Sequence, residues 1–206
     1  GAGVVLAVLV FLFAYRFFSP PAEEARHMIA PIEQLRFQRL TDSGDVVYPT
    51  ISPNGEMLAY VRLQAEQGSL WIKQIATDRA VEILPASARG YRSLTFSPDG
   101  TYLYFRQEAD GSSIYQCSVL GGTPKKVADN VWSDFGISPD GTQLSFVRRD
   151  ADRQRFSIIL SKLDGSGERE VAFRESPADF RTTPAFSPDG QRVAVSGGIQ
   201  GQNLPK

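Results

Sequence analysis

The sequence has little of what most enzymes and metal sites need. Cys117 is the single cysteine and His27 the single histidine among 206 residues. One cysteine cannot form a disulfide within the chain, and one histidine leaves few ligands for a zinc site. The 22 lysines and arginines nearly cancel the 23 aspartates and glutamates, which gives a net charge of -1. Because binding nucleic acid by bulk electrostatics needs a basic surface, no nucleic-acid partner is expected.

Catalytic and cofactor motifs are also missing. The chain has no Gly-x-Ser-x-Gly motif of the kind that carries a hydrolase serine. Asp150 and Asp152 are spaced like the start of a calcium loop, but Arg153 and Arg155 stand where further oxygen ligands are needed. Cys117 is expected in a strand as a small packed hydrophobe. We therefore expect no catalytic residue, no metal ion and no cofactor in this chain.

The first 18 residues are typical of a membrane segment. Residues 1–15 carry no charge, and Arg16 is the first ionic residue. Eighteen helical residues span about 27 Å, close to the roughly 30 Å hydrocarbon layer. This predicts a transmembrane helix over residues 1–18, truncated at its start, and a proline-containing linker over residues 19–34. A cleaved secretory signal peptide is the alternative, and either interpretation places the rest of the chain outside the cytoplasm.

A turn tetrapeptide repeats four times in the remaining sequence. The copies begin at residues 52, 97, 138 and 187, so they recur every 41 to 49 residues, close to the length of one four-stranded propeller blade. Proline presets φ at the second turn position, Asp or Asn tolerates the third, and glycine supplies positive φ. Each tetrapeptide is therefore predicted to be a tight hairpin turn. The four copies are Ser52-Pro53-Asn54-Gly55, Ser97-Pro98-Asp99-Gly100, Ser138-Pro139-Asp140-Gly141 and Ser187-Pro188-Asp189-Gly190.

The residues that flank the turns align as well. Apolar residues stand one before each serine and again six and eight after it, and this even spacing marks one buried face of a strand. Small residues stand two before each serine, which suits an innermost strand where blades crowd together; they are Thr50, Thr95, Gly136 and Ala185. Further apolar strands follow the first three turns. Each unit is therefore predicted to be an antiparallel four-stranded meander, which makes the fold class all-β.

This repeat resembles that of the TolB-like β-propellers, relatives of the WD-repeat propellers. The resemblance rests on Phe96-Ser97-Pro98-Asp99-Gly100, followed by Leu103, Phe105 and Ile114-Tyr115, and it covers residues 35–206. Because such propellers usually have six blades, it implies an incomplete propeller of about four blades. Residues 35–44 also resemble the stretch that opens this propeller in bacterial membrane proteins with a cytoplasmic Ser/Thr kinase or winged-helix domain.

The resemblance implies a non-catalytic role. We expect a sensor or binding propeller of a bacterial inner-membrane regulator, held by one membrane helix, with the propeller in the periplasm and a protein or peptide as partner. Two alternatives stay open. One is a TolB-like envelope scaffold that binds protein peptides, and the other is the propeller gate of a truncated serine peptidase.

The candidate binding residues lie in the loops that precede the innermost strands. In a propeller these loops gather at one mouth of the central channel, where residues from many blades converge. Aromatic and arginine side chains are enriched at binding surfaces. Packing between blades is the alternative role for the aromatic residues Tyr91 and Trp132. The predicted ligand or partner contacts at the channel mouth are Tyr48, Tyr91, Arg92, Trp132, Asp134 and Arg181.

Overall fold

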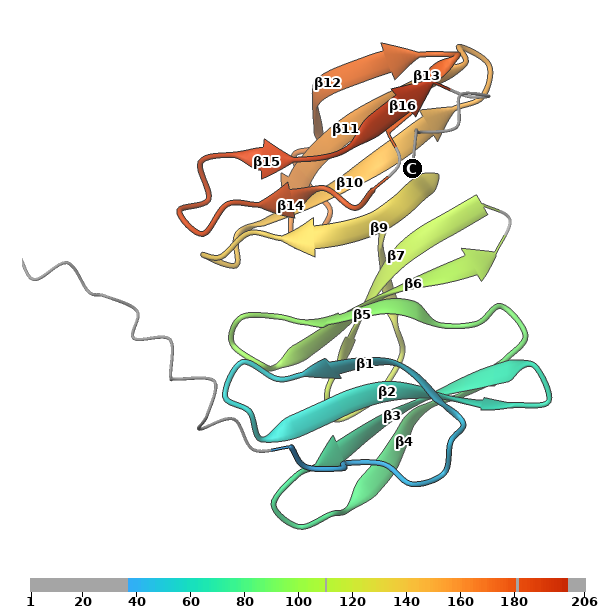
Figure 1. Cartoon of the computed structure of the whole chain (residues 1–206), viewed down its shortest axis with the longest axis vertical. Coiled ribbons are helices and arrows are strands. Elements are labelled where there is room, and N and C mark those ends of the chain that lie inside the picture. Colours follow the sequence, from blue (N-terminus) through green and yellow to red (C-terminus); the bar gives the residue numbers. More distant parts are fainter. Residues whose placement is uncertain (1–36, 110, 181, 200–206) are drawn as a thin grey trace, which may run out of the picture. The chain divides into compact units, whose positions relative to one another are not determined.

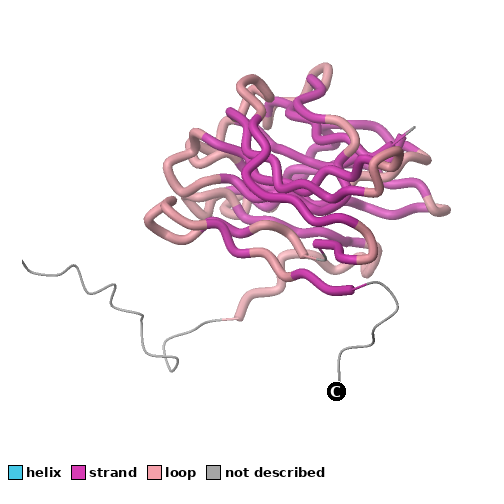
Figure 2. The backbone as a smooth tube through the Cα atoms, turned by 90° about the horizontal axis from the view of Figure 1, so that it is seen from above, coloured by secondary structure: helices cyan, strands magenta, loops and turns pink. Residues whose placement is uncertain are grey.

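The computed structural model describes residues 37–109, 111–180 and 182–199. The chain divides into two units, Gly1–Arg39 and Leu40–Lys206, and the fold below is that of the second unit. Its described residues form strands joined by loops, with no helical segment among them (Figure 2). The part of the chain that is described accordingly holds no helix able to cross a membrane. The transmembrane helix predicted at residues 1–18 and the linker at 19–34 lie outside this part.

Three complete four-stranded sheets follow one another along the chain (Figure 1). In each sheet the strands are antiparallel and neighbours in sequence are neighbours in space, so each sheet is the predicted meander. Blade 1 consists of β1 (Val46–Ile51), β2 (Met57–Gln64), β3 (Gln67–Gln74) and β4 (Ala80–Ser87). Blade 2 consists of β5 (Arg92–Phe96), β6 (Tyr102–Ala109), β7 (Gly111–Ser118) and β8 (Lys125–Ala128). Blade 3 consists of β9 (Val131–Ile137), β10 (Gln143–Asp150), β11 (Arg155–Lys162) and β12 (Arg169–Glu175).

The fourth copy of the repeat forms two short two-stranded sheets. One joins β13 (Ala178–Phe180) to β16 (Gly197–Ile199), and the other joins β14 (Ala185–Phe186) to β15 (Val193–Ala194). β13 and β14 follow each other in the chain and pair with β16 and β15, respectively. β13 and β14 are therefore two pieces of the inner strand, and β15 and β16 are two pieces of the second strand. The third strand expected near residue 204 lies outside the described residues.

The predicted turns are confirmed in all four copies. In the second, Gly100 N donates to Ser97 O at 2.8 Å and Ser97 N donates to Tyr102 O at 2.9 Å. Thr101 N donates to Asp99 Oδ1 at 3.0 Å, so the carboxylate holds the turn's own backbone. Hydrogen bonds from the turn serines lower the pKa of the turn carboxylates, which are Asp99, Asp140 and Asp189. These aspartates are therefore turn residues, each bound within its own blade.

The turns also pack one blade against the next. An added Cβ at Gly141 would lie 2.8 Å from Cγ of Pro98, the proline of the preceding blade's turn. The same pairing joins Gly100 to Pro53 at 3.9 Å, just within ordinary contact. Gly100 and Gly141 thus have two roles: they adopt positive φ in the turn, and they leave room for the proline ring of the preceding blade.

Three apolar clusters hold successive blades together. Adjacent residues of β6 point to opposite faces: Phe105 packs toward blade 1, and Tyr104 packs toward blade 3. A third cluster joins blade 3 to Phe180 of the fourth copy. Cys117 is buried in the first cluster, as predicted, and its burial raises the pKa of the thiol to about 11. Small side chains are needed on the inner strands, since a Cβ at Gly136 would lie 2.5 Å from the Pro184 carbonyl oxygen.

Candidate functional site

The inner strand of each complete blade carries an irregularity near its start. The pairing register shifts between Val47 and Thr50 in β1 and between Arg92 and Thr95 in β5. In blade 3 the register shifts in the same region, opposite the stretch of β10 from Phe146 to Arg148. β-Bulges bend a strand and re-aim its side chains, and they are frequent near functional sites. The inner strands start, and the second strands end, on one surface, which we call the mouth face; the four turns lie on the opposite surface.

Two residues in these bulges have a backbone conformation that is rare outside glycine. Tyr48 has φ of 52° and Ser93 has φ of 55°. Both stand four residues before their turn serine, and Asp134 occupies this position in blade 3. Left-handed residues other than glycine cost free energy and gather at functional sites. The repeat thus brings a polar side chain from each of three blades to the mouth face.

These side chains touch across the blade boundaries. Arg92 Nη1 donates to the Tyr48 hydroxyl at 3.0 Å, and the guanidinium lies 6.0 Å from the centre of the tyrosine ring. The Ser93 hydroxyl donates to the Asp134 carboxylate. Blade 1 is therefore linked to blade 2, and blade 2 to blade 3, by polar contacts on the mouth face.

Charges alternate along the same surface. Glu108 lies 3.3 Å from Arg92 Nε and 4.0 Å from Arg106 Nη2. Arg106 Nε in turn lies 3.3 Å from the Asp134 carboxylate. Exposed ion pairs stabilise a fold little, so their main effect is to orient the side chains. We call this set the mouth network; it consists of Tyr48, Arg92, Ser93, Arg106, Glu108 and Asp134.

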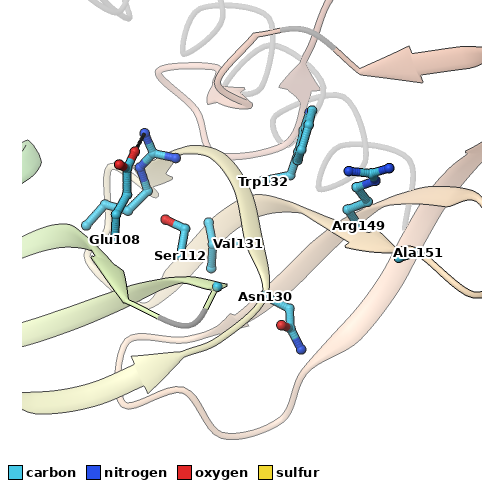
Figure 3. A pocket seen from close by; sticks show the side chains of 9 residues that line it. Glu108, Ser112, Asn130, Val131, Trp132, Arg149 and Ala151 are labelled. Carbon is cyan, nitrogen blue, oxygen red and sulfur yellow. Dashed lines mark ion pairs between the residues drawn. The ribbon is translucent and has the colours of Figure 1, made fainter. Parts of the chain in front are cut away.

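A cleft of about 640 Å³ opens beside the mouth network (Figure 3). It lies where β6 turns into β7, where β9 starts and where β10 ends, so blades 2 and 3 both line it. We call it the mouth cleft; its polar and aromatic lining is Arg106, Glu108, Ser112, Asn130, Trp132 and Arg149. This volume is within the range of small-ligand sites.

Several groups of the mouth cleft lack a partner in the described chain. Trp132 is 46% exposed and meets Phe156 edge-on, with ring centres 5.5 Å apart. Arg149 lies 5.0 Å from the centre of the Trp132 ring and makes no ion pair or hydrogen bond with any described residue. The Ser112 hydroxyl oxygen is buried and forms no hydrogen bond within the described residues, whereas the neighbouring Arg106 Nε lies 3.3 Å from the Asp134 carboxylate. The mouth cleft therefore offers unused donors next to an open aromatic surface.

The structure places the predicted contact residues in three ways. It brings Tyr48, Arg92 and Asp134 into the mouth network and Trp132 into the mouth cleft. Tyr91 is instead 6% exposed, and its hydroxyl donates to the Pro85 carbonyl at 2.8 Å. This burial raises the pKa of Tyr91, and the residue packs between blades, which was the alternative role. Arg181 lies outside the described residues.

The sequence prediction missed Arg106, Glu108, Ser112 and Arg149. They lie on the second and third strands of their blades, whereas the prediction considered only the loops before the inner strands. The topology contains the missing signal. In a meander the second strand runs antiparallel to the first, so its last residues lie on the face where the inner strand starts. Charged residues after the apolar part of β6 and β10 therefore belong to the mouth face.

The described part of the chain contains no cluster of metal-binding side chains. No group of three or more His, Cys, Asp or Glu side chains suited to a metal ion occurs within residues 37–109, 111–180 and 182–199. Asp150, which begins the calcium-like spacing, accepts a hydrogen bond from Arg153 N at 3.0 Å and pairs with its Nε at 3.5 Å. The nearest cation to this carboxylate is thus an arginine of its own loop.

Comparison with known proteins finds relatives by structure alone. No family model and no curated protein matches the sequence. TolB from Acinetobacter baumannii is similar over 80% of this chain and 41% of its own, with a TM-score of 0.64 and 19% identity. A TolB structure from Agrobacterium tumefaciens is similar over 76% of this chain and 55% of its own, with a TM-score of 0.59 and 23% identity. Prolyl oligopeptidase B from Galerina marginata is similar over 76% of this chain and 27% of its own, with a TM-score of 0.59 and 15% identity.

These likenesses concern the fold. The chain spans only about a quarter to a little over half the length of the three similar structures. The similarity extends over 76–80% of this chain, so it includes most of the blades drawn in Figure 1. The described residues accordingly have a β-propeller fold like that of the TolB structures.

Proposed function

We propose that the chain is a non-catalytic binding propeller, which serves as the extracytoplasmic sensor of a membrane-anchored bacterial regulator. The mouth network carries this proposal. Bulges in three inner strands turn Tyr48, Ser93 and Asp134 onto one surface, at the cost of two left-handed residues. Exposed ion pairs stabilise a fold little, and left-handed residues outside glycine cost free energy and cluster at functional sites, so the arrangement favours a binding surface.

The composition and the structural relatives support binding rather than catalysis. No catalytic motif occurs in the sequence, and the TolB structures share the fold. A nidogen–laminin complex is also similar in fold, with a TM-score of 0.55 and 13% identity, and its name records a protein bound to a protein. A protein or peptide partner at the mouth face is therefore the first candidate.

The membrane anchor is part of the same proposal. The apolar run at residues 1–18 would hold the propeller at the outer surface of the inner membrane, and residues 19–34 would carry a binding signal toward the cytoplasm. A fusion of alkaline phosphatase to the end of the chain should be active, because this enzyme folds only outside the cytoplasm. The matched control is a fusion at the same position to a fluorescent protein that becomes fluorescent only in the cytoplasm. Fluorescence without phosphatase activity would overturn the proposed location.

Site-specific photocrosslinking tests the binding face. Tyr48 on the mouth face is 40% exposed, and Tyr102 beside the second turn on the opposite face is 43% exposed. Replacing each in turn by a photoreactive phenylalanine gives two probes with equal chemistry and nearly equal exposure. We expect a discrete adduct from position 48 and none from position 102 in cells that make the full chain. Equal labelling from both positions, or no adduct from position 48, would contradict the proposal.

A peptidase gate is the second candidate, and a specific observation favours it. Prolyl oligopeptidase B has the same fold over 76% of this chain. The reading frame that encodes the chain separates the two candidates: a Gly-x-Ser-x-Gly domain in it favours the gate, and a kinase or winged-helix domain favours the sensor. A signal peptide with neither of these domains would favour an envelope scaffold.

A further inference from the structure

We infer that the mouth cleft is a carboxylate-binding site, with Arg149 as its anchoring cation and Trp132 as the surface for an apolar group of the ligand. The inference rests on the proposed function and specifies the chemistry of the bound group. Two sources share this chemistry, a small free carboxylate and the C-terminal carboxylate of a peptide.

Arg149 is the first observation. The other arginines around it have carboxylate partners: Arg148 pairs with Glu168 at 2.6 Å, and Arg153 pairs with Asp150 at 3.5 Å. Arg149 has none among the described residues, although it lines a cleft. Its guanidinium lies near Trp132 and Phe156, at 5.0 and 5.9 Å from the ring centres. A guanidinium over an aromatic face is pre-organised and keeps its planar edge available for two parallel hydrogen bonds.

An unpaired donor is the second observation. Ser112 Oγ is buried and makes no hydrogen bond in the described part of the chain, and it lines the same cleft. Asn130 also lines it but is exposed, so solvent reaches its amide and only the Ser112 hydroxyl is buried. A buried polar group without a partner costs free energy. A ligand acceptor in the mouth cleft would supply the missing partner.

The charge balance of the lining selects the type of anion. Two arginines and one glutamate line the mouth cleft, and Glu108 is held by Arg92 and Arg106. One uncompensated guanidinium therefore remains, which matches a singly charged planar carboxylate that accepts bidentate hydrogen bonds. A phosphate dianion would bring a second negative charge toward Glu108 without a second free cation.

Trp132 supplies the apolar side of the site. Nearly half of its surface is exposed, and its ring meets Phe156 edge-on. The Arg149 guanidinium lies 5.0 Å from the ring centre, and Figure 3 shows both side chains among the residues that line the cleft. Tryptophan and arginine are enriched among the residues that contribute most to binding energy at interfaces. A carboxylate carried on a short aliphatic or aromatic group would therefore contact Arg149 and Trp132 together.

Calorimetry on the full chain in detergent tests the inference with defined probes. The first pair is N-acetyl-Ala-Ala-Leu as the free acid and as its C-terminal amide, which differ only in the carboxylate. We expect the acid to bind and the amide to bind at least tenfold more weakly. Arg149→Gln should weaken binding of the acid at least tenfold, and Arg149→Lys should recover part of the loss, because lysine keeps the charge without the fork. Arg153→Gln is the matched control; its side chain is 75% exposed, and the charge change is identical.

The outcomes separate this inference from the proposed function. Equal binding of acid and amide, no binding of the acid, or equal effects of Arg149→Gln and Arg153→Gln would overturn the carboxylate site. A crosslinked adduct at Tyr48 would still support the binding propeller in each of these cases. N-acetyl-leucine distinguishes the two sources: affinity equal to that of the tripeptide indicates a small carboxylate, and binding of the tripeptide alone indicates a peptide C-terminus. Circular dichroism of both arginine variants checks that the fold is unchanged.

Discussion

Replacing Gly141 by alanine tests whether the turns join the blades. Gly141 has φ of +69°, and an added Cβ would lie 2.8, 3.2 and 3.3 Å from three atoms of the Pro98 ring. Carbon atoms do not approach to 2.8 Å, so the alanine would push the third turn away from the second. Gly55 has nearly the same backbone, with φ of +73°, and nothing lies within 4 Å of its added Cβ. The two glycines thus share the turn position and backbone conformation and differ in the neighbouring ring.

The expected magnitude has two parts. A left-handed alanine costs about 1–2 kcal/mol in either turn. Overpacking against the proline ring adds about 1–3 kcal/mol for Gly141→Ala alone. We therefore expect Gly55→Ala to lower the free energy of unfolding by about 1–2 kcal/mol and Gly141→Ala by about 2–5 kcal/mol.

Urea unfolding of the full chain, followed by tryptophan fluorescence, measures both variants. Pro98→Ala removes the ring and should recover much of the difference when it is combined with Gly141→Ala, which gives a double-mutant cycle. Equal losses for Gly55→Ala and Gly141→Ala would refute the reasoning. So would a cycle with no coupling between positions 98 and 141, because the turns would then be independent.

Two further predictions concern pH. Burial raises the pKa of the Cys117 thiol to about 11. As pH rises above the thiol's ordinary pKa, the unfolded chain loses this proton before the folded chain does. The free energy of unfolding should therefore fall by up to about 3 kcal/mol between pH 9 and 11. Cys117→Ala should flatten this decline in urea midpoints, and an unchanged slope would contradict the assignment. Serine hydrogen bonds lower the pKa of Asp99, Asp140 and Asp189, so stability present above about pH 4 should be lost as pH falls through the lowered values. Asp140→Asn should reduce this acid sensitivity, whereas an equal acid response would refute it; Asn54 shows that an amide can occupy the same turn position.

The sequence predicts the scaffold well because the scaffold repeats. A turn that appears four times with the same serine, proline and glycine specifies its own hydrogen bonds, and the structure contains them in each copy. The strands follow from the turns, since apolar residues at fixed distances after each serine assign one face to the core. Local chemistry and periodicity therefore suffice for the blades.

The mouth face was harder to predict, because its contacts join residues that the repeat does not relate. Tyr91 and Arg92 are neighbours in the sequence, yet one packs against Phe105 and the other reaches Tyr48 in the preceding blade. Adjacent residues of an extended chain point to opposite sides, and the bulge that follows Arg92 leaves a weak sequence signal. The meander topology places Arg149 on the mouth face, but its lack of a carboxylate partner among the described residues is visible only in the three-dimensional arrangement.

The two ends of the blades are under different constraints. The position of the turn serine is identical in all four copies, because each serine closes a turn. The position four residues earlier holds Tyr48, Ser93, Asp134 and Thr183, which are all polar but differ in size and charge. A position that served the fold alone would repeat as the serine does. Its variation, within bulges that present it at the mouth face, is what a surface that recognises one particular partner requires, because each blade must then contribute a different contact.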